Sequence, residues 1–209
     1  MAEYAVRLEN INMIYSDANK NQRKVLDNLS LNIKKGEFIS LLGPSGCGKT
    51  TLLNIIADLI QPTSGTAEVA GVSPRKSRLS HKYGMVFQSA SLLPWRTVIK
   101  NIELPIELRK IPPKIRHEKA LEQLKAVDLQ GNENAYPSEL SGGMQHRVGI
   151  ARALAADPEI LLMDEPFSAL DEFTKERLHG DLLRISAQNR LYGIRRRRYC
   201  RCTKAFKRA

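Results

Sequence analysis

The chain has 209 residues, of which 42% are hydrophobic, and a formal net charge of +11 at pH 7. This length fits one domain with a sizeable core. No stretch approaches the roughly 18 consecutive apolar residues of a membrane span, and the first residues lack the pattern of a secretory signal. The three cysteines do not make a disulfide framework, which favours a reducing, cytoplasmic setting.

The positive charge is concentrated at the end of the chain. Residues 1–181 carry 23 basic and 22 acidic side chains, whereas residues 182–209 carry 10 basic side chains and no acidic one. Because the excess is confined to this tail, the net charge does not indicate that the main body of the chain binds nucleic acid.

Alternation of apolar and polar residues predicts strands over residues 3–11, 29–33 and 66–70. Two more continuous apolar segments, residues 37–42 and 83–88, are typical of buried strands. Turn-forming residues separate these segments, and no internal repeat is present.

From residue 91 to residue 129 the pattern becomes helical, with interruptions at Pro105 and at residues 111–113. Periodic apolar residues then predict a helix over residues 114–126, and a further helix over residues 144–155.

A glycine-rich segment joins the strand that ends at Leu42 to a helix that begins at Leu52. Strand, G-x-x-x-x-G-K-T loop and helix in this order are the context of a phosphate-binding P-loop, rather than of a plain glycine turn. Its glycines let several backbone N–H groups point at one anion, and the helix N-terminus adds the positive end of its dipole. The loop consists of Gly43, Pro44, Ser45, Gly46, Cys47, Gly48, Lys49, Thr50 and Thr51.

The last residues of this loop carry the chemistry of the site. Lys49 would reach the β- and γ-phosphates, and the Thr50 hydroxyl would ligate Mg²⁺. The sequence therefore predicts a binding site for a nucleoside triphosphate.

Two acids, Asp164 and Glu165, follow an apolar strand over residues 160–163. P-loop enzymes hold Mg²⁺ with an acid at such a strand end, a role that suits Asp164. Glu165 is placed to polarise the attacking water as a general base. Simple surface termination of the strand is the alternative, and the P-loop upstream favours the catalytic interpretation.

The run Leu140-Ser141-Gly142-Gly143-Met144-Gln145 precedes the helix predicted from Met144, and Ser141 is expected to cap that helix. Its glycines leave backbone N–H groups open to an anion. This L-S-G-G-x-Q run, with the P-loop, the L-L-M-D-E-P run and Asp171, resembles the ATP-binding cassette subunits of ABC transporters. The resemblance covers about residues 3–181, with a mild departure at Met144, where Gln is commoner.

The resemblance implies an α/β fold: a P-loop NTPase (RecA-like) core with an antiparallel β subdomain and a helical subdomain. The cassette domain would span residues 1–181 and the helical subdomain about residues 89–154. Residues 182–209 form a basic tail of doubtful structure.

The resemblance also implies roles for single residues toward ATP and Mg²⁺. Tyr15 matches the aromatic residue that stacks on adenine, with a buried core tyrosine as the alternative. Gln88 matches the glutamine that senses Mg²⁺ and the attacking water, so it joins Glu165 as a catalytic residue and Thr50 and Asp164 as a metal ligand.

The same family pattern implies a head-to-tail dimer with two ATP molecules between the subunits. Ser141, Gly142 and Gly143 would grip the γ-phosphate of ATP held by the other subunit, and Asp171 matches an acid that crosses the dimer interface. His146, beside this run, is expected on the helix surface without a role.

The run Leu92-Leu93-Pro94-Trp95 lies in the region that receives a membrane subunit in this family. It looks like that of importers for nitrate, sulfonates, taurine and related small anions, or for pyrimidine precursors. Leu93 and Trp95 would supply apolar contact, with a core role of Trp95 as the alternative. The implied function is ATP hydrolysis that powers import of a small solute, at the cytoplasmic face of the membrane. The implied partners are a permease, a second cassette and, indirectly, a solute-binding protein, and no nucleic acid.

After Asp181 the resemblance stops. Family members continue with an apolar strand and a His-Asp pair, whereas no histidine follows His179 here, and His179 itself comes too early for that position. We therefore expect the core sheet to lack its next strand. A frameshift or truncation after about residue 186 is favoured over a genuine basic segment for anionic lipid or nucleic acid.

Two other functions remain open. A non-catalytic remnant of such a subunit would bind ATP without turnover. A soluble ABC ATPase of DNA repair or translation usually carries coiled-coil arms or paired cassettes, which this sequence lacks.

Overall fold

The structure, a computed structural model, describes residues 4–16, 21–164 and 192–197, which fall into two compact units. Of these residues, the first unit contains those up to Tyr83, together with 162–164 and 192–197. The second unit contains residues 84–161.

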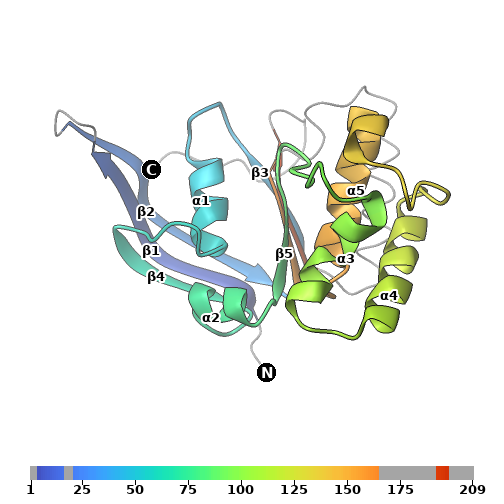
Figure 1. The fold of residues 1–209 in the computed structure, drawn as a ribbon. Coiled ribbons are helices and arrows are strands. Elements are labelled where there is room, and N and C mark those ends of the chain that lie inside the picture. Colours follow the sequence, from blue (N-terminus) through green and yellow to red (C-terminus); the bar gives the residue numbers. More distant parts are fainter. Residues whose placement is uncertain (1–3, 17–20, 165–191, 198–209) are drawn as a thin grey trace. The chain divides into compact units, whose positions relative to one another are not determined.

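The first unit holds a three-stranded antiparallel sheet in the order β2-β1-β4, which Figure 1 shows in blue and green. Its strands are β1 (Tyr4–Ser16), β2 (Gln22–Lys34) and β4 (Ser64–Val69). Leu8 of β1 lies opposite Leu31 of β2 and Ala67 of β4, and its side chain is buried. The predicted antiparallel β subdomain is thus confirmed, with strands longer than expected.

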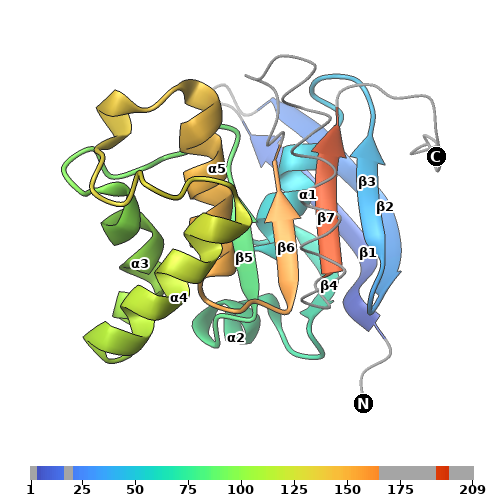
Figure 2. The same cartoon turned by 90° about the vertical axis from the view of Figure 1, so that its right-hand side faces the viewer.

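The first unit also contains a parallel pair of strands. β3 (Phe38–Leu42) pairs with β7 (Tyr192–Arg197), and β6 (Ile160–Met163) follows β7 in the strand order. Figure 2 shows β3 and β7 side by side with their arrows in the same direction. The expectation that no strand follows Asp181 was therefore wrong. Parallel pairing uses backbone N–H and C=O groups, so it does not require an apolar sequence pattern.

Helix α1 (Lys49–Ile56) begins at the lysine of the P-loop, three residues before the predicted start at Leu52, and buries Leu52, Leu53 and Ile56. A second helix of this unit, α2 (Pro74–Leu79), was not predicted, because six residues are too few to show a helical period. Its Arg78 forms an ion pair with Asp58 just after α1 at 2.9 Å.

The second unit is mainly helical and begins with the last residues of β5 (Tyr83–Val86). It contains α3 (Val98–Leu108), α4 (Pro113–Ala126), the short 3₁₀ helix η1 (Pro137–Glu139) and α5 (Gly142–Leu154). Figure 1 shows α3, α4 and α5 side by side.

The helices over residues 114–126 and 144–155 are confirmed by α4 and α5, and the break at residues 111–113 separates α3 from α4. Pro105, which we expected to interrupt the pattern, lies inside α3. A proline removes one backbone hydrogen bond of a helix. Here the apolar face of α3 stays buried on both sides of it, through Ile102 and Ile106.

Glu103 of α3 is a buried charge that joins two helices. Its side chain is 1% exposed and lies 2.9 Å from Lys100 Nζ, 3.3 Å from Arg116 Nε and 2.9 Å from His117 Nδ1. Burial alone would raise the pKa of Glu103. The hydrogen bonds from Lys100 and His117 and the charges of Lys100 and Arg116 outweigh burial and hold the pKa below its usual value.

Gly48 fixes the position of the P-loop against the first sheet. It caps α1 at its N-terminus with φ +95, a left-handed conformation that L residues rarely adopt. A Cβ atom at this position would lie 2.8 Å from Leu26 Cδ2 and 3.0 Å from the carbonyl oxygen of Val25, both in β2. Only glycine allows the loop to pass this close to the strand.

We expect Glu103→Gln to lower the free energy of unfolding by about 2 kcal/mol at neutral pH, because it removes the charge that pairs with three basic groups. A carboxyl whose folded-state pKa is lowered is stabilising above its unfolded value of about 4.3, and this contribution is lost as the pH falls through the folded-state pKa. Urea unfolding followed by circular dichroism across this range measures the difference between variant and wild type. That difference should shrink in acid, whereas Glu118→Gln, at an exposed position of α4, should change little at any pH.

We expect Gly48→Ala to destabilise the chain by roughly 2 kcal/mol more than Gly36→Ala. Both glycines have left-handed φ values, +95 and +84, so both variants carry the same kind of backbone strain, about 1–2 kcal/mol. A Cβ atom at Gly36 meets nothing within 4 Å, so the difference isolates the clash with β2. Equal midpoints of thermal unfolding for the two variants would contradict the prediction, because the clash with β2 would then cost no stability.

Candidate nucleotide-binding site

The lysine of the P-loop is folded back onto the loop itself. Lys49 is 5% exposed, and its Nζ donates to the carbonyl oxygens of Gly43 at 2.7 Å and Pro44 at 2.6 Å. The same nitrogen lies 3.3 Å from Cys47 Sγ. An ammonium group has three N–H donors, and these contacts hold it over the loop. A phosphate oxygen is a stronger acceptor than a neutral carbonyl, so this ammonium suits an anionic ligand.

The loop backbone turns through two left-handed residues, Gly46 at φ +78 and Gly48 at φ +95. The first N–H groups of α1, which starts at Lys49, have no acceptor within the helix. Together with the positive end of the helix dipole they form a cradle for a phosphate group. The donors present, backbone N–H groups and one ammonium, fit the phosphates of ATP.

Asp164, directly after β6, belongs to the same unit as the P-loop and is buried. Its carboxylate and the hydroxyl of Thr50 are hard oxygen ligands of the kind that Mg²⁺ prefers. Within the described ranges, no group of three or more His, Cys, Asp or Glu side chains could hold a metal ion. Glu165 and Asp171 lie outside the described residues.

Tyr15 lies near the end of β1, opposite Arg23 of β2. Its side chain is 42% exposed, so the alternative that it is a buried core tyrosine is wrong. An exposed ring at this place is available for stacking on an adenine base.

The second unit carries the other predicted site residues. Gln88 follows β5. Ser141, the N-cap of α5, and the first two residues of that helix, Gly142 and Gly143, are here called the signature turn. Ser141 Oγ accepts a hydrogen bond from Met144 N at 3.3 Å, which confirms Ser141 as the N-cap of α5.

His146 was expected on the helix surface, and this was wrong: its side chain is 6% exposed and faces Gln88 and Gly142. The signal was present in the sequence. His146 is spaced four and seven residues from Ile150 and Ala153, two apolar positions on one helix face that are both buried.

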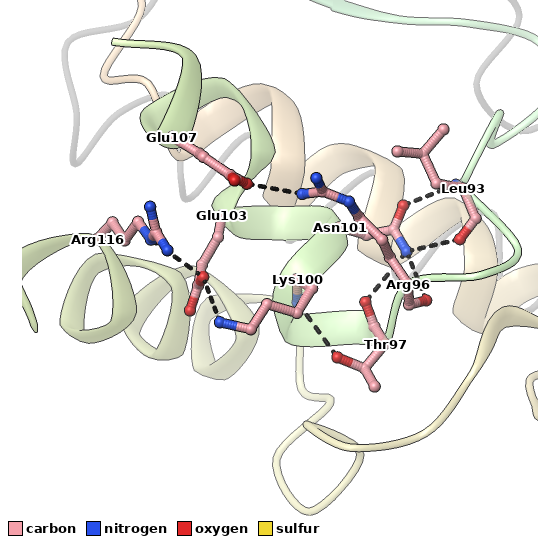
Figure 3. A network of polar contacts seen from close by, with 8 residues as sticks. All are labelled: Leu93, Arg96, Thr97, Lys100, Asn101, Glu103, Glu107 and Arg116. Carbon is pink, nitrogen blue, oxygen red and sulfur yellow. Dashed lines mark hydrogen bonds and ion pairs between the residues drawn. The ribbon is translucent and has the colours of Figure 1, made fainter. Parts of the chain in front are cut away.

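Trp95 is 71% exposed, which excludes the alternative that it is a core residue. The loop that carries it is held by the buried Asn101 of α3, as Figure 3 shows. Asn101 Oδ1 accepts from Leu93 N at 2.8 Å, and its Nδ2 donates to the carbonyl oxygens of Leu93, Arg96 and Thr97 at 3.0–3.1 Å. A buried amide with all these partners fixes the loop, so Trp95 is displayed at the surface by a rigid support.

Across the ranges that the structure describes, no helix has both the length and the apolar character that a membrane crossing requires.

Comparison with known proteins shows the family. The family model described as ABC transporter matches residues 26–168. A dimeric ATP-binding cassette in a post-hydrolysis state bound to ADP and phosphate has a similar structure, with a TM-score of 0.82 and 37% sequence identity. That alignment covers 91% of this chain and 87% of the other. The expected α/β fold of a P-loop cassette is thereby confirmed.

Among curated relatives, an uncharacterised ABC transporter ATP-binding protein of Methanocaldococcus jannaschii is 49% identical, over 86% of this chain and 66% of the relative. The taurine import ATP-binding protein of Yersinia pestis is 47% identical, over 78% and 63%. The aliphatic sulfonates import ATP-binding protein of Bacillus subtilis is 49% identical, over 77% and 61%. The chain thus spans slightly less than two thirds of the length of these relatives. It belongs to the ABC transporter family, as an ATP-binding cassette.

Proposed function

We propose that this chain binds ATP with Mg²⁺ and hydrolyses it to power the import of a small solute through a membrane permease. The observation that carries the proposal is the P-loop, in which the buried ammonium of Lys49 and the N-terminus of α1 form a cradle for phosphate. The family of the chain and the names of its relatives, which are import ATP-binding proteins, support it.

In this proposal, Lys49 and the N–H groups at the start of α1 bind and orient the phosphates. Thr50 and Asp164 hold Mg²⁺, which when bound neutralises charge on the phosphate oxygens. Tyr15 stacks on the adenine. Gln88 is the glutamine that senses Mg²⁺ and the attacking water.

The steps that depend on a second subunit are also part of the proposal. Glu165 acts as general base on the attacking water, and Asp171 crosses the interface of a head-to-tail dimer. Ser141, Gly142 and Gly143 of one subunit contact the γ-phosphate held by the other. The dimeric state of the similar cassette bound to ADP and phosphate supports this arrangement.

The proposed partners are permease subunits and, indirectly, a solute-binding protein, at the cytoplasmic face of a membrane. The rigidly supported Trp95 offers an exposed aromatic anchor of the kind that dominates protein interfaces. Taurine and aliphatic sulfonates, named for two relatives, point to small sulfonate anions as the class of imported solute.

We expect a fluorescent ATP analogue with Mg²⁺ to bind the chain, and Lys49→Ala to weaken that binding by about tenfold or more, because a hydrogen bond to a charged group contributes about 1.5–3 kcal/mol. Tyr15→Ala should weaken it several-fold through the lost stacking. Lys35→Ala, at an exposed turn outside the loop, is the control and should bind as the wild type does. Unchanged affinity of the Lys49 variant would contradict the proposed site.

Hydrolysis is tested separately by measuring phosphate release. Glu165→Gln should keep ATP affinity and lower kcat by about 100-fold or more, because it removes the general base. A wild-type chain that binds ATP without releasing phosphate would instead favour the non-catalytic remnant, since no histidine follows His179 to take the position that family members fill.

A further inference from the structure

One face of α5 holds the segment that follows β5, here called the Gln88 segment (residues 88–91). His146 Nε2 lies 2.9 Å from the carbonyl oxygen of Gln88, and its Nδ1 lies 3.0 Å from the carbonyl oxygen of Gly142. The imidazole is buried. Through these two contacts it links Gln88 to the signature turn, the two predicted site segments of the second unit.

Two more positions of α5 continue the same contact. A Cβ atom at Gly149 would lie 3.5 Å from the carbonyl oxygen of Ala90, an ordinary contact that shows how closely the helix passes this segment. Arg152 donates to the carbonyl oxygens of Ala90 at 2.9 Å and Ser91 at 2.8 Å. The Gln88 segment is thus held by its backbone carbonyls along two turns of one helix.

This mode of attachment leaves the side chain of Gln88 uninvolved in the contact, because the acceptor is its carbonyl group. Both ring nitrogens of His146 face acceptors, so the N–H group of the imidazole is used for one of these two carbonyls. An apolar residue at this position would leave one of these carbonyls without its N–H donor, and an unsatisfied acceptor that stays buried costs about 1–3 kcal/mol.

We propose that His146 is a positioning residue, which fixes the backbone of Gln88 relative to the signature turn so that both move as one body. This inference rests on the proposed function, in which Gln88 acts on Mg²⁺ and water. Loss of His146 should then loosen Gln88 without touching Lys49 and the P-loop, which belong to the other unit. We therefore expect the loss of His146 to lower kcat and to leave the affinity for ATP unchanged.

The experiment compares His146→Leu, which removes both ring nitrogens, with His146→Gln, whose amide N–H reaches a carbonyl again. Hydrogen–deuterium exchange of the full chain without nucleotide reports directly on the amides of residues 87–92. We expect exchange there to rise about tenfold in His146→Leu, that of α1 to stay unchanged, and His146→Gln to restore slow exchange. The kinetic measurement should show kcat lowered by about tenfold with unchanged ATP affinity, and rescue by His146→Gln.

Arg147→Leu is the matched control. Arg147 is the next residue of α5 and also donates to a backbone carbonyl, that of Val127 at 3.2 Å, which lies outside the Gln88 segment. Its loss should leave exchange of residues 87–92 unchanged. His146→Asn is the second variant in case the leucine variant does not fold, because its shorter amide keeps a polar group in place and does not reach Gln88.

Slow exchange of residues 87–92 in a folded His146→Leu or His146→Asn would overturn the proposal. Raised exchange with an unchanged kcat would overturn the positioning role as well, since His146 would then serve the fold alone. If the wild-type chain releases no phosphate, the proposed hydrolysis fails, and the exchange measurement still decides whether His146 holds the Gln88 segment.

Discussion

The close approach of Gly48 to β2 is the constraint on which the rest of the first unit depends. The left-handed turn at Gly48 sets where α1 begins, and α1 sets where the N–H groups of its first turn point. β2 is in turn paired along β1, so the three-stranded sheet supports the loop from behind. A phosphate cradle needs donors in fixed positions before the ligand arrives, and this backbone contact provides them without any side chain at the loop's closest point.

In the second unit, loops are held in fixed positions by side chains that bind their backbone carbonyls. Asn101 holds the loop before α3, whereas His146 and Arg152 hold the Gln88 segment on α5. These loops carry the exposed Trp95 and the predicted sensor Gln88, and the side chain of neither residue takes part in the contacts that hold its loop. Functional side chains can be displayed from irregular segments in this way because helices supply the rigid support.

The P-loop and the N-cap at Ser141 could be predicted because each is a local motif: the required residues are neighbours in sequence and their geometry follows from backbone chemistry. Features that depend on distant partners could not. β7 forms a strand because β3 offers a parallel edge, which no local pattern in the basic tail reveals. Pro105 is tolerated inside α3 because Ile102 and Ile106 are buried on either side, and propensity alone cannot weigh that packing.

The buried polar residues of α3 and α5 show why sequence patterns underestimate such positions. A histidine or an asparagine in a predicted helix is expected at the surface, because polar side chains are usually exposed. Burial is acceptable here because these side chains meet backbone groups of a loop: Asn101 Nδ2 donates to the carbonyl oxygen of Arg96, and His146 Nε2 lies 2.9 Å from that of Gln88. These hydrogen bonds offset the cost of burying the polar side chain and also satisfy backbone groups of the loop. His146 and Asn101 are thus two cases within one unit of a buried polar residue that holds an irregular segment, whereas the buried Glu103 joins two helices through basic side chains.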